Sequence, residues 1–125
     1  MDETRVDTLA LAVGNMHGML KAMVDGTAKK RLDIERVRAI KRAAPIFVTL
    51  HGASGTDDDD LRRAIAAGIT VVHINTEVRL AWRHGLDAAL ARQPSEIVPN
   101  KLLPGVVDSV KQVVAARLEL FSNPQ

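Results

Sequence analysis

Short apolar runs alternate along the chain with longer amphipathic segments. Three apolar runs have the length of strands: Val6–Val13 (VDTLALAV), Ile46–Leu50 (IFVTL) and Ile69–Ile74 (ITVVHI). A compact apolar run of this length is typical of a strand inside a parallel sheet. We therefore predict three strands, and the first of them is predicted to be buried.

Helical spacing of apolar residues follows the first strand and continues between the later ones. Asp33 is placed to cap a helix that ends before Pro45. Thr56 and Asp59 resemble a capping box for the next helix, which Gly68 closes. Each of these helices is predicted to connect two strands.

Two further helices are predicted in the last third of the chain, at Thr76–Arg92 and from about Pro104 to Leu120. The alternation of strand and helix with short links predicts βαβ units, and hence an α/β fold with a parallel sheet. The apolar residues of the last helix that we expect to face the core are Val106, Val110, Val113, Val114 and Leu118.

Composition narrows the possible chemistry. The 125 residues contain no cysteine, so a metal site has to use histidine and carboxylates. A formal charge of +2, one Trp, two Phe and no Tyr argue against a nucleic-acid or membrane partner. No basic leader or long apolar span is present, so we expect a cytoplasmic protein that acts on a small molecule.

Candidate functional residues follow the predicted strands. His17, His51 and the segment His73–Thr76 each lie at or just past the carboxyl end of a strand, where parallel α/β folds place their sites. His17 and His51 are separated by the ~30 residues of one βαβ unit, so their imidazoles are placed to share a metal ion. The alternative is that each is a hydrogen-bonded loop residue.

A glycine-containing turn, Gly52–Gly55, follows His51 and precedes a helix. Its backbone amides, the Ser54 hydroxyl and the helix N-terminus are suited to a phosphate, and His73–Thr76 is a candidate second element. The alternative is a tight turn that needs glycine for positive φ. The acidic run Asp57–Asp60 is interpreted as a solvated helix cap, because acids in a first turn complement the helix dipole.

Three segments together are more specific than any one of them: VGNMHGMLK, KRLDIERVRAIKRAAPIFVTLHGASG and AAGITVVHINTEVRLAW. In order and spacing they resemble the class II, zinc-dependent fructose-bisphosphate and tagatose-bisphosphate aldolases over essentially the whole chain. The resemblance implies a (β/α)8 barrel in which Zn²⁺ polarises the carbonyl of dihydroxyacetone phosphate during reversible aldol cleavage. The site residues that it implies are His17 and His51 for zinc, and Gly18, Lys21, Gly52, Ala53, Ser54, His73, Asn75 and Thr76 for the substrate and its phosphate.

The chain departs from the family pattern in two places. His73 stands where many relatives have Asn, which affects the contact to the ketose. The family's adjacent Asp-His pair, which supplies the catalytic Asp and another zinc ligand, does not occur in this sequence, so no catalytic residue is assigned. A complete barrel needs eight strands and ~250 residues.

We therefore expect residues 1–125 to be the C-terminal half of an incomplete barrel without its N-terminal half. The leading hypothesis is a ketose-bisphosphate aldolase, a carbon–carbon lyase, that is inactive until an N-terminal half-barrel complements it, and that is also expected to form homo-oligomers. The alternatives are a non-catalytic module that binds sugar phosphate or serves assembly, and a remnant without a stable fold.

Overall fold

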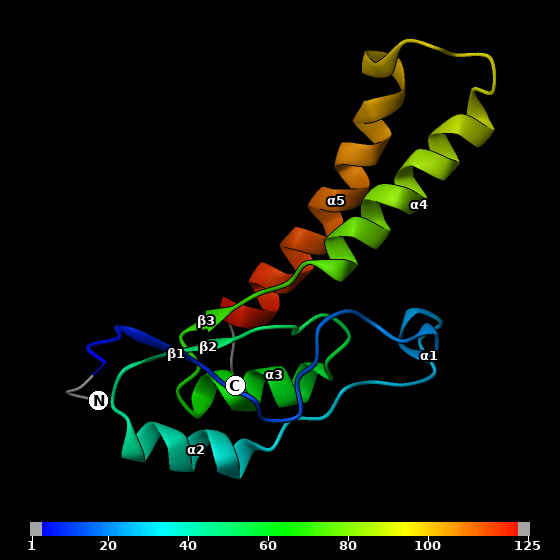
Figure 1. The fold of residues 1–125 in the computed structure, drawn as a ribbon. Coiled ribbons are helices and arrows are strands. Elements are labelled where there is room, and N and C mark those ends of the chain that lie inside the picture. Colours follow the sequence, from blue (N-terminus) through cyan, green and yellow to red (C-terminus); the bar gives the residue numbers. More distant parts are fainter. Residues whose placement is uncertain (1–3, 123–125) are drawn as a thin grey trace. The chain divides into compact units, whose positions relative to one another are not determined.

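The computed structural model describes residues 4–122. The chain forms two compact units: the first runs to Ile74 and also includes the residues from Leu120 onwards, and the second is Asn75–Glu119. No helix within residues 4–122 is long and apolar enough to cross a membrane. Figure 1 shows the elements in order along the chain.

The first unit contains a three-stranded parallel sheet in the order β1-β2-β3. Its strands are β1 (Thr8–Ala10), β2 (Phe47–Leu50) and β3 (Val71–Val72), and its helices are α1 (Lys21–Val24), α2 (Ile34–Ala43) and α3 (Asp58–Ala66). Helices α2 and α3 pack against each other and lie on one side of the strands (Figure 1). The predicted α/β class and parallel pairing are therefore confirmed.

The core of the first unit lies between the sheet and its helices. Val48 and Leu50 of β2, Val37 of α2 and Leu61 of α3 are all at most 1% exposed. Asp33 accepts a hydrogen bond from the amide of Arg36 at 2.9 Å and caps α2 as predicted. Leu120, from the end of the last helix, also belongs to this core.

The first predicted strand is wrong in extent and in burial. Only Thr8–Ala10 pair as a strand, and all three residues are exposed. Their exposure has a physical cause, because β1 is an edge strand that pairs only with β2 within the described sheet. The buried apolar residues of the run, Leu11 and Val13, lie after the strand and pack into the core from the loop.

The second unit is a pair of helices, α4 (Thr76–Arg92) and α5, which starts at Pro99 and runs to Ser122 with its last residues in the first unit. Gly85 permits their close approach, since a Cβ there would lie 3.0 Å from the Cα of Val106. An ion pair joins Glu77 to Arg117 at 2.7 Å. The predicted bounds of α4 are confirmed.

Two predictions for the last helix are wrong. It begins at Pro99 and contains Pro104 in its second turn, where the proline cannot donate a backbone hydrogen bond. Val106 is buried as expected, but Val114 and Leu118 are 40% and 61% exposed. A helix packed along one side buries a single stripe, and these two positions fall outside it.

Candidate active site

Three imidazoles gather after the ends of the three strands. His51 and His73 directly follow β2 and β3, and His17 lies in the loop after β1. The ring centroids of His17 and His51 are 5.9 Å apart, and those of His51 and His73 are 4.3 Å apart. Parallel pairing of the strands is the cause, because it brings their carboxyl ends to the same edge of the sheet.

His17 and His51 are the pair of zinc ligands predicted from the sequence, and their rings lie on neighbouring loops. Two imidazoles bound to one tetrahedral zinc have centroids about 5 Å apart, given Zn–N bonds of ~2.0 Å, so at 5.9 Å the observed rings lie farther apart than such a pair. The Nδ1 atoms of His51 and His73 are 3.1 Å apart, and such a contact is compatible with metal ligation through Nε2. Within residues 4–122, no group of three His, Cys, Asp or Glu side chains forms a full ligand set.

Asn15 holds the backbone around these histidines and was not singled out from the sequence. Its Nδ2 donates hydrogen bonds to the carbonyls of Leu11 and His51, both at 2.9 Å. Its Oδ1 accepts from the amide of Val13 at 2.8 Å. One side chain thereby links the end of the β1 run to the backbone of His51.

The loop Gly52–Gly55 packs directly against the loop that carries His17. Gly52 has φ +64°, and a Cβ on it would lie 2.4 Å from the carbonyl oxygen of Met16. Gly52 is thus required both by its conformation and by this close approach. Ser54 is 3% exposed, and the amide of Ala53 donates to the carbonyl of His73 at 3.3 Å.

The N-terminus of α3 is already occupied by the protein's own carboxylate. Oδ1 of Asp57 accepts from the amides of Asp59 and Asp60 at 3.1 and 3.3 Å. The helix N-cap is therefore Asp57, and the predicted capping box of Thr56 and Asp59 is wrong. The helix N-terminus drops out of the predicted phosphate cradle, which leaves the loop before it.

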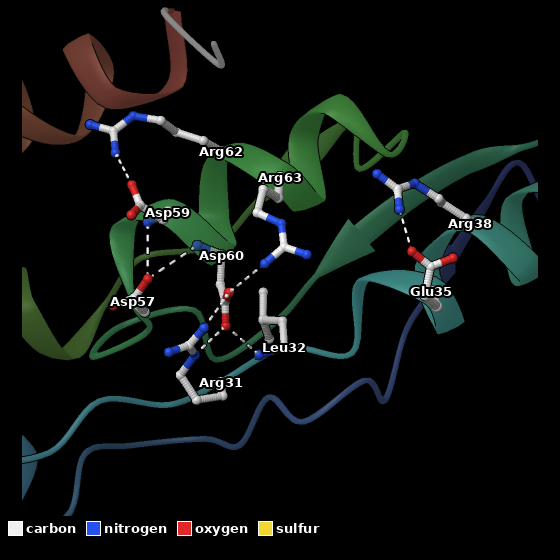
Figure 2. A network of polar contacts seen from close by, with 9 residues as sticks. All are labelled: Arg31, Leu32, Glu35, Arg38, Asp57, Asp59, Asp60, Arg62 and Arg63. Atoms are coloured by element: carbon white, nitrogen blue, oxygen red, sulfur yellow. Dashed lines mark hydrogen bonds and ion pairs between the residues drawn. The ribbon is translucent and has the colours of Figure 1, made fainter.

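Asp60 departs from the predicted solvated cap. It is 1% exposed, and its Oδ2 accepts from Nε of Arg31 at 2.7 Å and from the amide of Leu32 at 2.9 Å (Figure 2). The Arg31 hydrogen bond is the main cause that lowers the pKa of Asp60, and burial opposes it. This acid fastens α3 to the segment before α2, because its helical position faces inward.

The remaining predicted residues fall in two places along the chain. Gly18 has φ +77° with open space at its Cα, and Lys21 is an exposed residue at the start of α1. Asn75 and Thr76 belong to the second unit, where Asn75 is the N-cap of α4 without a side-chain capping bond.

Lys30 is a second residue that sequence reasoning missed. It stands in the basic run Lys29–Arg31, which has the appearance of a solvated segment, yet it is 4% exposed. Its Nζ lies 2.6 Å from the carbonyl oxygen of Gly18 and 2.6 Å from that of Ser54. No periodicity or motif in the sequence indicates this burial.

Comparison with known proteins identifies relatives over nearly the whole chain. The family model for class II fructose-bisphosphate aldolase matches residues 1–124. Fructose-bisphosphate aldolase of Thermus caldophilus is 31% identical over an alignment of 144 residues, which spans 98% of this chain and 46% of the relative. The 6-phospho-5-dehydro-2-deoxy-D-gluconate aldolase of Shouchella clausii (strain KSM-K16) is 34% identical over 95% of this chain and 39% of its own length.

Solved structures give the same coverage. The YdjI aldolase of Escherichia coli K12 matches with a TM-score of 0.75 and 30% identity over 96% of this chain and 41% of its own. A fructose-1,6-bisphosphate aldolase homologue of Coccidioides immitis, 22% identical, matches in fold with a TM-score of 0.75 over 97% of this chain and 40% of its own. The chain thus spans less than half the length of the relatives it matches.

Proposed function

Because this chain belongs to the class II fructose-bisphosphate aldolase family and forms part of an α/β barrel of that kind, we propose that it contributes the substrate-binding side of a zinc-dependent ketose-bisphosphate aldolase. The observation that carries the proposal is the placement of His17 and His51 after neighbouring parallel strands, with ring centroids 5.9 Å apart. The glycine loop that follows His51 supports it.

In this proposal His17 and His51 hold the zinc ion, which when bound supplies a Lewis acid for the ketose carbonyl. Asn15 donates a 2.9 Å hydrogen bond to the carbonyl of His51 and so fixes the position of the backbone from which the His51 side chain extends. His73 orients the His51 ring through the 3.1 Å contact between their Nδ1 atoms. A hydrogen bond from a neighbouring side chain to the second ring nitrogen of a ligand imidazole sets the tautomer and the direction of that ring.

The phosphate is assigned to the loop after His51. Gly52, Ala53 and Ser54 offer backbone groups and one hydroxyl ahead of α3, and Gly18, in the loop after β1, and Lys21, at the start of α1, are proposed as further contacts. Asn75 and Thr76, at the start of α4, are proposed as a further phosphate contact. The amide of Ala53 already donates to the carbonyl of His73, so this amide is not assigned to the phosphate.

The proton-transfer group is proposed to come from outside these 125 residues, since the sequence has no Asp-His pair. A complementing N-terminal half-barrel would supply it together with another zinc ligand. Association with such a half, or with further copies of the chain, would also cover apolar side chains that are exposed here, such as Phe47 at 63%. Residues 1–125 alone are therefore expected to bind ligands without turning them over.

The test is aldol cleavage by the chain alone and by the chain mixed with the N-terminal half-barrel of a close relative. Fructose 1,6-bisphosphate and 6-phospho-5-dehydro-2-deoxy-D-gluconate are the two substrates, because His73 replaces a residue expected to contact the ketose. We expect zinc-dependent cleavage only in the mixture. Zinc binding without activity in any mixture would instead favour the non-catalytic binding module.

Replacing either zinc-binding imidazole should abolish activity. In the reconstituted enzyme, His17→Ala and His51→Ala are each expected to lower kcat/KM by at least about a thousandfold, since loss of a ligand removes the metal that activates the carbonyl. Zinc content by atomic absorption should fall in parallel. His84→Ala, an exposed histidine of α4, is the matched control and should retain both properties. Full activity in both variants would refute the zinc assignment.

Ser54→Ala tests the phosphate assignment separately. It should weaken binding of dihydroxyacetone phosphate by about tenfold, the effect of one hydrogen bond to a charged group, and leave zinc content unchanged. Isothermal titration calorimetry on the zinc-loaded chain measures it. Ser95→Ala, at an exposed position after α4, is the control. Equal affinities for the two variants would exclude Ser54 from the phosphate site.

A further inference from the structure

The ammonium group of Lys30 is enclosed by main-chain carbonyl oxygens. Its Nζ lies 2.8 Å from the oxygen of Met16, 2.6 Å from Gly18, 3.0 Å from Gly52 and 2.6 Å from Ser54. An ammonium has three N–H donors, so four acceptors at these distances engage all of them. The ammonium loses its water of hydration on burial, and the peptide carbonyls take the place of that water.

The four oxygens come from the two loops that carry the candidate zinc ligands. Met16 and Gly18 flank His17, and Gly52 and Ser54 follow His51. The Lys30 backbone makes two further hydrogen bonds at the second loop. Its amide donates to the carbonyl of Gly55 at 2.8 Å, and its carbonyl accepts from the amide of Asp57 at 3.0 Å. Lys30 therefore contacts both loops at once, although it belongs to neither.

Carbonyl oxygens that converge on one point repel each other unless a cation lies between them. Shells of carbonyl oxygens of this kind are the ones that proteins use to replace the hydration of K⁺. Here the cation is covalently attached to the chain, through a side chain that is 4% exposed. Its removal would take away the cation that four carbonyl oxygens of the two loops share.

We propose that Lys30 is a positioning residue, a built-in monovalent cation that sets the spacing of the loops bearing His17 and His51. It has no contact with the reacting atoms and acts through the backbone on either side of the two histidines. The effect on zinc affinity rests on the proposed function, whereas the effect on loop order does not. A small free cation should be able to take the place of the ammonium.

The test replaces the charge and then returns it. Lys30→Met keeps the length of the side chain and removes its charge, and Lys29→Met is the matched control at an exposed neighbour. In tetramethylammonium chloride, the zinc affinity of Lys30→Met should fall by about tenfold or more, the usual cost of losing a group that holds the metal ligands in position. Replacing that salt with NH₄Cl or KCl at equal ionic strength should restore most of it. The parent chain and Lys29→Met should not respond to the choice of cation.

Thermal unfolding, followed by circular dichroism in the same salts, gives a readout that needs no zinc. The melting temperature of Lys30→Met should rise in NH₄⁺ or K⁺ relative to tetramethylammonium, and that of the parent should not. A loss that is the same in every salt, including failure to fold in all of them, would overturn the proposal. So would a variant that matches the parent.

A measurement on the unmodified chain makes the inference independent of the variant. In ¹H–¹⁵N spectra of the side-chain ammonium groups, the protons of Lys30 should exchange slowly with water, and those of exposed Lys29 should not. Fast exchange at Lys30 would contradict the enclosed site. If the parent chain bound no zinc while Lys30 exchanged slowly and its variant responded to NH₄⁺, the metal assignment would fail and the cation inference would stand.

Discussion

Gly52→Ala is expected to destabilise the chain by at least about 3 kcal/mol and to remove zinc binding. The φ of +64° at Gly52 costs an L-residue about 1–2 kcal/mol. The larger cost is steric, because the new Cβ would lie 2.4 Å from the Met16 oxygen and 3.0 Å from the His17 amide nitrogen. Both atoms belong to backbone and cannot rotate away, so the loop carrying His17 must move.

The measurement is urea unfolding together with zinc titration of the folded variant. Gly26→Ala is the matched control, since Gly26 has a similar φ of +75° but nothing within 4 Å of the added Cβ. It should show the conformational cost alone, and zinc affinity should be unchanged. If the two variants lost equal stability, the close approach of the two loops would have no energetic weight.

Asp60→Asn is expected to lower the free energy of unfolding by about 3 kcal/mol at pH 7. The carboxylate is 1% exposed and bonds to Nε and Nη2 of Arg31 at 2.7 and 3.0 Å and to the Leu32 amide (Figure 2). An amide cannot accept both guanidinium bonds, and removing one partner of a buried pair costs ~3–5 kcal/mol. Because the side chain of Arg31 is 68% exposed, water can solvate the guanidinium that is left, and we expect a loss near the lower end of that range.

The pH dependence of stability should identify the same group. The Arg31 hydrogen bond holds the pKa of Asp60 below its ordinary 3.8, so the unfolded chain binds a proton at this group more readily. The stabilisation is complete above about pH 4 and is lost as pH falls through the lowered pKa. The difference between parent and Asp60→Asn should therefore shrink below pH 4.

Asp59→Asn is the control for this acid-dependent loss. Asp59 pairs with Arg62 at 2.8 Å, but its side chain is 82% exposed, and exposed pairs contribute less than ~1 kcal/mol. Its variant should unfold within about 1 kcal/mol of the parent at pH 7. A similar loss in both variants would mean that the net charge at the start of α3, and not the buried contact of Asp60, stabilises the helix.

Local sequence signals were sufficient for most elements. The two ends of α2 were predicted correctly from Asp33 before the amphipathic segment and Pro45 after it. Helix caps and helix breakers act within one turn, so neighbouring residues are enough to locate them. The predicted α4 agrees at both ends for a similar reason. Strand bounds were less accurate, since pairing shortens the run Ile69–Ile74 to Val71–Val72. A strand exists only where a neighbouring strand accepts its hydrogen bonds, and sequence does not give that neighbour.

The same division holds at the site. The order of strands and helices predicted that His17, His51 and His73 follow strand ends, and the resemblance supplied the metal and the phosphate. Neither the element order nor the resemblance predicted that Lys30 and Asp60 are buried, because in the sequence each residue is one more charge in a polar run. Their burial depends on contacts with segments at least 12 residues away.

By itself, the sequence determined the α/β class, the family and the positions of the histidines along the chain, because these follow from short-range periodicity and from motifs in order. Only the tertiary structure decided which carbonyls surround Lys30, why Gly52 has no room for a side chain, and which of four consecutive acids is buried. Those outcomes depend on how closely two loops and a helix approach, and that distance is set by packing of the whole unit.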